Sequence, residues 1–111
     1  MSPDLGHLRD IVVSATIALS HISDHTMESF IVDTKTQDAV LWRLAVIGET
    51  ANNMTDATRA AIDAPWHQII GMRHVAIHHY RKLDMTRIWG TVRDRAPDLL
   101  VQVNEFLQDI P

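Results

Sequence analysis

The chain has 111 residues, a formal net charge of −4 and no cysteine, so we expect one domain over residues 1–111. The absence of cysteine excludes a disulfide framework, a thiolate nucleophile and a cysteine-bound metal, and the acidic balance argues against a nucleic-acid binder that relies on its overall charge. No apolar run approaches the roughly 20 residues that span a bilayer, and no signal peptide is recognisable. We therefore expect a cytoplasmic protein without a membrane partner.

The first part of the chain predicts one long helix and one helical turn. Apolar residues recur in steps of three and four over residues 5–22, the spacing of a helix that buries one face. Its expected buried stripe consists of Leu5, Leu8, Val12, Ala15, Leu19 and Ile22. Ser2 is the expected N-terminal cap with Pro3 at the first helical position, and the helix should end near residues 23–25. Residues 27–32 should form a short helical turn.

A second long helix is predicted from about Thr34 to Asn53. Its expected core residues are Val40, Leu44, Ile47, Ala51 and Met54, flanked by Leu41 and Ala45. Gly48 lies inside this helix, where glycine costs about 1 kcal/mol relative to alanine. Close approach of another backbone is one reason to find glycine at such a position. Together with the small core, Gly48 favours association of two copies of the chain.

The second half of the chain predicts further helices and few strands. They are expected over residues 56–62, from residue 65 to about residue 80, and from residue 85 to about residue 107. Thr55 and Asp84 are the expected caps of the first and the last of these stretches, and Pro65 opens the middle one. Pro97 should either kink the last stretch or open a separate helix. The sequence therefore predicts an all-α fold.

The stretch from Gly71 to Tyr80 is the densest in reactive groups. Arg73 can hold a phosphate through two parallel hydrogen bonds, His78 can move a proton near neutral pH, and Tyr80 adds a phenol. Six of the ten Lys and Arg residues lie within residues 73–95, opposed there by two Asp residues, which leaves a local charge of about +4. This segment is either a local site for a polyanion or a solvated face that pairs with acids elsewhere.

Arg73 and His78 point in different directions on an ideal helix. The residues within about 60° of Arg73 are Trp66, Ile70, Ile77 and Tyr80. An arginine in the middle of this apolar stripe needs an ion-pair partner, for which Asp33 and Glu49 are candidates, or a phosphate in a cleft or subunit junction. His78 lies about 140° away from Arg73. That angle favours a site at a dimer junction, where the helix meets its symmetry mate.

Three histidines share a different face of this helix, namely His67, His74 and His78. His74 and His78 are four residues apart, a spacing that suits two ligands of one metal ion. No carboxylate near them on the helix and no cysteine completes such a site, so we expect neither a metal nor another cofactor. His67 and His74 are then exposed polar residues, and a metal-dependent enzyme built on the three histidines remains as an alternative.

The spacing Arg73-x4-His78-x-Tyr80 resembles the Arg-x4-6-His-x-Tyr motif of HepT-like toxins, within the HEPN superfamily of small helical ribonucleases. Other stretches resemble the landmarks of that family, in the same order: Phe30-Ile-Val-Asp33, Thr36-Gln-Asp-Ala-Val40, Ile47-Gly-Glu49, Pro65-Trp-His-Gln-Ile-Ile-Gly-Met-Arg73 and Trp89. The resemblance spans essentially the whole chain.

The resemblance implies a HEPN-type bundle of about five helices that forms a homodimer with its active site along the interface. The implied activity is metal-independent endonucleolytic cleavage of RNA, such as tRNA or mRNA, with Arg73 and His78 as catalytic residues. The implied partner is a minimal, MntA-like nucleotidyltransferase antitoxin. It would neutralise the toxin by AMPylation of Tyr80, in assemblies of a dimer or of higher order.

Supporting roles and departures from the family pattern follow from the same resemblance. Asp33 and Glu49 look like landmarks that orient Arg73 or close the dimer. His74 stands where a small polar residue is usual after the arginine, and it either alters the orientation of Arg73 or adds a second proton carrier. Thr50 stands where alanine is frequent. The alternative function is a non-catalytic helical dimer that binds a nucleotidyltransferase partner or a nucleotide.

Overall fold

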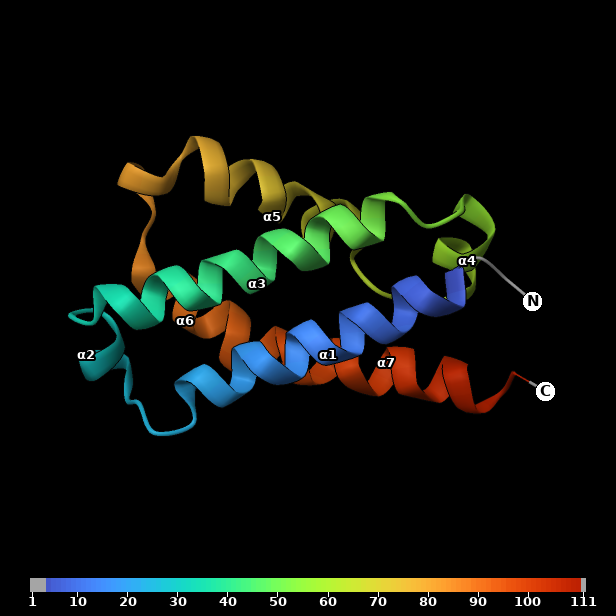
Figure 1. The fold of residues 1–111 in the computed structure, drawn as a ribbon, viewed down its shortest axis with the longest axis horizontal. Helices are drawn as coiled ribbons and strands as arrows, with labels where there is room; N and C mark the ends of the chain where they lie inside the picture. Colours follow the sequence, from blue (N-terminus) through green and yellow to red (C-terminus); the bar gives the residue numbers. More distant parts are fainter. Residues whose placement is uncertain (1–3, 111) are drawn as a thin grey trace.

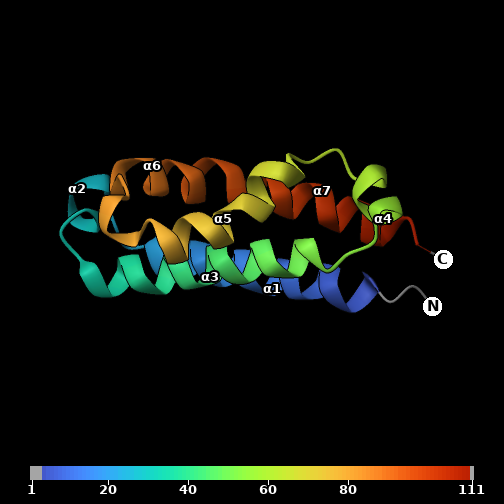
Figure 2. The same cartoon turned by 90° about the horizontal axis from the view of Figure 1, so that it is seen from above.

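The computed structural model of the chain describes residues 4–110 and shows long helices that run roughly along one axis of a body of 45 × 28 × 19 Å (Figures 1 and 2). The α-helices are α1 (Asp4–Ile22), α2 (Met27–Phe30), α3 (Thr34–Asn52), α4 (Asp56–Ala61), α5 (Trp66–His78), α6 (Met85–Gly90) and α7 (Ala96–Gln108). The 3-10 turn η1 (Tyr80–Lys82) follows α5, and the π-helical segment η2 (Thr91–Arg95) joins α6 to α7. The described residues contain no strand, so the all-α prediction is confirmed. None of their helices is long and apolar enough to cross a membrane.

Helix α1 packs against both α3 and α7, and this double contact sets its buried face (Figure 1). The predicted stripe is right for three residues that are buried, Leu8, Ala15 and Ile22. The other three, Leu5, Val12 and Leu19, are half-buried, and Val12 and Leu19 pack against the core. The buried face also includes Ile11, Ser14 and Ala18, because helices cover α1 on two sides. The predicted cap Ser2 and the first-position Pro3 lie outside the described residues.

Helix α3 carries the predicted core stripe and lies against α5 at very short range. All seven predicted core residues of this stretch are buried: Val40, Leu41, Leu44, Ala45, Ile47, Ala51 and Met54. A Cβ added to Gly48 would lie 2.8 Å from the carbonyl oxygen of Ile69 and 3.1 Å from the backbone nitrogen of Arg73. The predicted close approach of a backbone is therefore confirmed. The approaching backbone is α5 of the same chain, so Gly48 does not support a dimer.

The C-terminal third is one helical run from Met85 to Gln108 that changes its hydrogen bonding in the middle. Asp84 caps it by accepting a hydrogen bond from the backbone N–H of Thr86, as predicted. Ala96 donates its N–H to the carbonyl of Thr91, the five-residue step of a π-helix. Pro97 has no N–H to continue this pattern, and it stands in the first turn of α7. Of the two predicted roles for Pro97, the opening of a final helix is the one observed.

Asp4 ties the start of α1 to the start of α4. Its buried carboxylate accepts hydrogen bonds from the backbone N–H and hydroxyl of Thr55 and, at 2.5 Å, from the hydroxyl of Thr58. Thr55 also caps α4 by accepting the N–H of Thr58. The hydrogen bonds from the two threonine hydroxyls hold the pKa of Asp4 below its ordinary value of 3.8. One ionised side chain thus fastens two distant parts of the chain.

Replacing Asp4 by alanine should lower the free energy of unfolding at pH 7 by about 2 kcal/mol, because the Thr55 and Thr58 donors lose their acceptor. A lowered pKa stabilises the fold above the unfolded pKa and loses this effect as the pH falls through the folded pKa. The gap between parent and Asp4→Ala should therefore narrow as the pH drops below about 4. Urea unfolding at several pH values measures both effects. Asp10→Ala, an exposed carboxylate of the same helix, is the control, and a gap that is constant with pH would contradict the assignment.

Candidate active site

Arg73 lies on the outer face of α5 and pairs with α3. Its Nε is 2.7 Å from Oε2 of Glu49, and the two side chains are 56% and 46% exposed. The predicted place of Arg73 in a buried apolar stripe is wrong, since α5 buries Trp66 and Ala76 whereas Ile77 is 57% exposed. An exposed pair of this kind is weak and screened by salt. Among the described residues the two terminal amino groups of Arg73 have no hydrogen-bond partner, so its fork remains available to a phosphate.

Asp33, one of the two predicted ion-pair partners of Arg73, makes no ion pair with it in the described residues. Asp33 caps α3: its carboxylate accepts hydrogen bonds from the backbone N–H of Thr36 at 3.1 Å and from the Thr36 hydroxyl at 2.7 Å. His25 adds a contact of 3.6 Å to the same carboxylate. The hydrogen bonds from Thr36 lower the pKa of Asp33. The role of Asp33 in this chain is thus visible as a helix cap, and the ion-pair partner of Arg73 is Glu49.

Three imidazole rings gather at the C-terminal end of α5. The ring centroid of His74 lies 4.5 Å from that of His78 and 5.3 Å from that of His79. All three side chains are exposed, and His78 is the last residue of the helix. His74 is exposed, as predicted, but it also contacts His78. No hydrogen bond or ion pair joins Arg73 to His78 in the described part of the chain. Within one chain Arg73 contacts Glu49 and His78 contacts His74, so the two side chains have different partners.

The metal-dependent alternative needs a set of ligands that this cluster does not complete. Residues 4–110 contain no group of three or more His, Asp or Glu side chains that could hold a metal ion. His67 lies near the other end of α5 and takes no part in the ring contacts of His74 and His78. The three histidines that share a helix face in the sequence are therefore not one site in space.

Tyr80 lies outside α5, in the turn η1, and the predicted extension of the helix to Tyr80 is wrong. The helix ends at His78 with His79 as its C-terminal cap, and the chain then turns so that Leu83 and Met85 reach the core. The Tyr80 hydroxyl donates a hydrogen bond to Oδ1 of Asp38 on α3. In Figure 1 this end of α5 lies over the first half of α3. The bond and the burial raise the pKa of the Tyr80 phenol above its ordinary value of 10.0.

Two hollows meet at Tyr80. One has a volume of about 490 Å³ and is lined only by residues 77–82, which include His78, Arg81 and Lys82. The other, of about 270 Å³, is a groove between α3 and α5. Its lining consists of Asp38, Leu41, Trp42, Ala45, Ala76, Ile77 and Tyr80. One side of Tyr80 is thus basic and the other mainly apolar.

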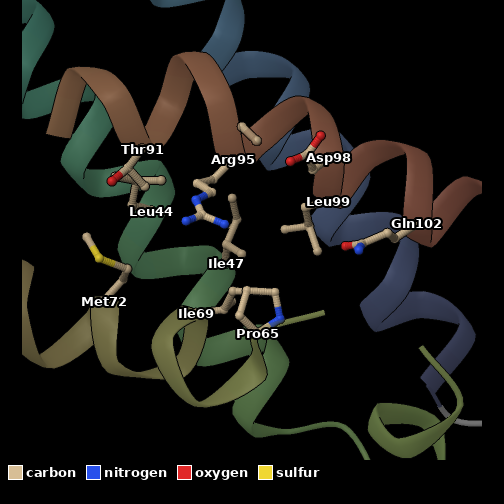
Figure 3. A pocket seen from close by; sticks show the side chains of 11 residues that line it. Leu44, Ile47, Pro65, Ile69, Met72, Thr91, Arg95, Asp98, Leu99 and Gln102 are labelled. Atoms are coloured by element: carbon tan, nitrogen blue, oxygen red, sulfur yellow. The ribbon is translucent and has the colours of Figure 1, made fainter. Parts of the chain in front are cut away.

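A third hollow lies on a different side of α5, between α3, α5 and the C-terminal helical run (Figure 3). It has a volume of about 120 Å³ and a mainly apolar lining, into which Arg95 reaches toward Ile47 (Figure 3). No histidine or tyrosine lines it. Histidine is the side chain whose ordinary pKa suits proton transfer near neutral pH best, so the end of α5 is the better candidate for an active site.

The structure adds Asp38 to the residues that the sequence singled out. Asp38 is an exposed acidic residue within a long helix, and no role of its own was predicted for it from the sequence. The phenol that it contacts lies 42 residues away. Helical periodicity reports only neighbours three and four residues apart. The landmark stretch Thr36-Gln-Asp-Ala-Val40 contains Asp38, but only the fold shows its contact with Tyr80.

Known proteins resemble this chain over nearly its whole length. Residues 12–106 match the family described as "Ribonuclease HepT-like". The chain is 32% identical to "Putative RNase MJ0127" of Methanocaldococcus jannaschii over 104 residues, which cover 93% of this chain and 86% of that protein. It is 33% identical to "Probable ribonuclease HepT" of Thermococcus cleftensis over 94 residues, 84% of this chain and 86% of that protein. It is also 30% identical to "Putative RNase TTE0752" of Caldanaerobacter subterraneus subsp. tengcongensis over 103 residues, 92% of each chain.

No solved structure gives a significant match to the chain. The family and the relatives confirm the resemblance seen in the sequence and, with it, the predicted class of enzyme, an endoribonuclease. The match runs through the segment that contains the arginine, the histidines and the tyrosine described above. The chain belongs to the HepT-like ribonuclease family.

Proposed function

We propose that this protein is the toxin of a toxin–antitoxin pair and cleaves RNA without a metal ion, through Arg73 and His78 at the junction of two identical chains. The observation that carries the proposal is the end of α5, where two of the clustered histidines, His78 and His79, line one hollow together with Arg81 and Lys82. Arg73, close by on another face, keeps its terminal amino groups unpaired. This is a set of proton carriers and phosphate ligands in reach of a large substrate.

The chemistry needs only groups that these residues and the RNA supply. The 2′-hydroxyl of the ribose attacks the adjacent phosphorus, and the bond to the 5′-oxygen of the next nucleotide breaks. His78 takes the proton of the 2′-hydroxyl or returns one to the departing oxygen, a role worth about 10²–10⁴-fold in rate. Arg73 stabilises the charge that grows on the phosphate oxygens. Its weak pair with Glu49 holds the guanidinium in place until a phosphate competes for it.

In the proposed dimer, a second copy of the chain supplies the His78 that works with Arg73 of the first. The exposed apolar residues beside the groove, Trp42 at 64% and Ile77 at 57%, provide contact surface for such a copy. A two-fold axis near this face brings Arg73 of one chain toward His78 of the other. The dimer then carries two such sites, each with Arg73 from one chain and His78 from the other. In this proposal, residues other than Arg73 and His78 select the RNA target, tRNA or mRNA.

The partner that we propose is a minimal nucleotidyltransferase antitoxin, which transfers AMP to Tyr80. The hydroxyl of Tyr80 is at the surface, with the side chain 42% exposed, and it borders the basic hollow. AMP on this oxygen places a bulky anion beside His78, Arg81 and Lys82. It then excludes the RNA backbone through like charge and steric conflict.

Cleavage of RNA by the purified, unmodified protein should persist in excess EDTA and fall about 10²-fold or more in His78→Ala. The measurement is the loss of labelled RNA, with a mass spectrum to show that Tyr80 carries no adduct. His67→Ala, another exposed histidine of α5, is the matched control and should cleave like the parent. Activity that EDTA abolishes would overturn the metal-free mechanism. No cleavage by unmodified parent would favour the binding module, and an AMP-sized adduct without cleavage would indicate a neutralised toxin.

A further inference from the structure

The hydrogen bond between Tyr80 and Asp38 joins two exposed side chains, and the described residues give neither of them another hydrogen bond or ion pair. Both side chains are exposed, and a bond of this kind adds little to stability in water. The bond nevertheless fixes the position of the phenolic oxygen, because Asp38 is carried by the long helix α3 and the Tyr80 ring lines the groove between α3 and α5.

We propose that Asp38 accepts the phenolic proton when the Tyr80 hydroxyl attacks a nucleotide, and that this contact makes Tyr80 the point of modification. The proposal rests on the proposed function of Tyr80 as the AMP acceptor. The reaction partner is a nucleoside triphosphate. The Tyr80 oxygen forms a bond to the α-phosphorus, the bond from that phosphorus to the bridging oxygen breaks, and pyrophosphate leaves. The proton passes from Tyr80 to Oδ1 of Asp38.

The geometry meets the requirements of a general base. A phenol with its proton is a weak nucleophile near neutral pH, and a carboxylate within hydrogen-bond reach of that proton removes it as the new bond forms. No other carboxylate in the described residues accepts a hydrogen bond from Tyr80. Once AMP is attached, the phosphodiester and Asp38 repel each other, and the hydrogen bond is lost because the oxygen has no proton left. Asp38 thus favours the attack of Tyr80, and the modified protein lacks the Tyr80–Asp38 hydrogen bond.

The chain offers a direct probe, because Tyr80 is its only tyrosine. Absorbance of the tyrosinate during an alkaline titration therefore reports on this side chain alone. In Asp38→Asn the phenol pKa should fall toward its ordinary value of 10.0, since the raising effect of the carboxylate is gone. Asp10→Asn, an exposed carboxylate on α1, should titrate like the parent. Equal titration of the parent and Asp38→Asn would show that the contact does not exist in solution and would overturn the proposal.

The role of Asp38 as a base is tested with the imidazolide of AMP, a reagent that transfers AMP to nucleophiles without an enzyme. At pH 7, Asp38→Asn should react at Tyr80 about 10²-fold more slowly than the parent, a typical effect of a general base. The deficit should shrink as the pH rises and reverse near the phenol pKa, because a phenolate needs no base and the variant ionises more readily. Tyr80→Phe is the blank. Equal labelling of the parent and Asp38→Asn at pH 7, or a deficit that stays constant with pH, would overturn the proposal.

Parallel labelling with the nucleotidyltransferase and ATP separates this proposal from the proposed function. Asp38→Asn should again be slowed about 10²-fold at neutral pH. A transferase that leaves the parent unmodified, together with Asp38-dependent labelling by the imidazolide, would refute the antitoxin mechanism and keep the role of Asp38. Asp38-independent labelling by both reagents would refute the role of Asp38 and keep the antitoxin mechanism.

Discussion

A mixture of Arg73→Ala and His78→Ala proteins should cleave RNA that neither variant cleaves alone. Each single variant is expected to lose about 10²–10⁴-fold in rate, because one lacks the phosphate ligand and the other the proton carrier. If Arg73 of one chain works with His78 of the other, a mixed dimer contains one site with both residues intact and one with neither. Random exchange makes about half of the dimers mixed, so about a quarter of the parental activity should return. Labelled RNA, followed after the two proteins are exchanged under mild denaturant, gives the measurement.

The mixing experiment has two controls in the same chain. Two batches of His78→Ala taken through the same exchange should stay inactive. His67→Ala mixed with Arg73→Ala should show about half of the parental activity both before and after exchange, as parental chains would. The result depends on the separation seen in the structure, where Arg73 pairs with Glu49 and His78 contacts His74. A mixture as inactive as its components would show that Arg73 and His78 act within one chain, and that α5 bends or Arg73 turns to bring them together.

Regular helical spacing explains why most of the fold was predictable from the sequence. The buried residues of α3 and the caps at Thr55 and Asp84 follow from periodicity and from hydrogen bonds within one turn. The buried face of α1 was only partly predictable, since Ile11 and Ala18 are also buried and α1 packs against α7, a helix from the far end of the chain, as well as against α3. The sequence of one helix cannot specify how many neighbours cover it.

The sequence named candidate site residues, and the structure shows an arrangement of them that the sequence did not predict. The motif identified the family and placed Arg73, His78 and Tyr80 within eight positions of each other. The ideal-helix angle between Arg73 and His78 agrees with their different contacts. The predicted environment of Arg73 and the predicted end of α5 at Tyr80 were wrong, because both depend on contacts with α3. Arg73 pairs with Glu49 at the surface, and Tyr80 contacts Asp38 from the turn beyond the helix.

The contact of α3 with α5 makes Gly48→Ala the substitution with the largest expected effect on stability. A Cβ at this position would lie 2.8 Å from the carbonyl oxygen of Ile69 and 3.2 Å from that of Ile70. Backbone atoms of a helix cannot move aside as a side chain can, so α5 must shift as a whole. The expected loss is about 1–3 kcal/mol in the free energy of unfolding, the range for overpacked cores. RNA cleavage should also fall, because the backbone nitrogen of Arg73 lies 3.1 Å from the same Cβ.

Gly71 on α5 supplies the matched control, since a Cβ added there meets no atom within 4 Å. Alanine is the better helix former, so Gly71→Ala should raise the free energy of unfolding by up to about 1 kcal/mol. The two substitutions are chemically identical and both lie within helices, yet they should have opposite signs in urea unfolding. A stabilising Gly48→Ala would contradict this, because it would mean that the carbonyl oxygen of Ile69 lies more than 2.8 Å from the added Cβ. Because Glu49 and Arg73 flank this crossing, cleavage should drop in Gly48→Ala even where the protein is fully folded, and stay unchanged in Gly71→Ala.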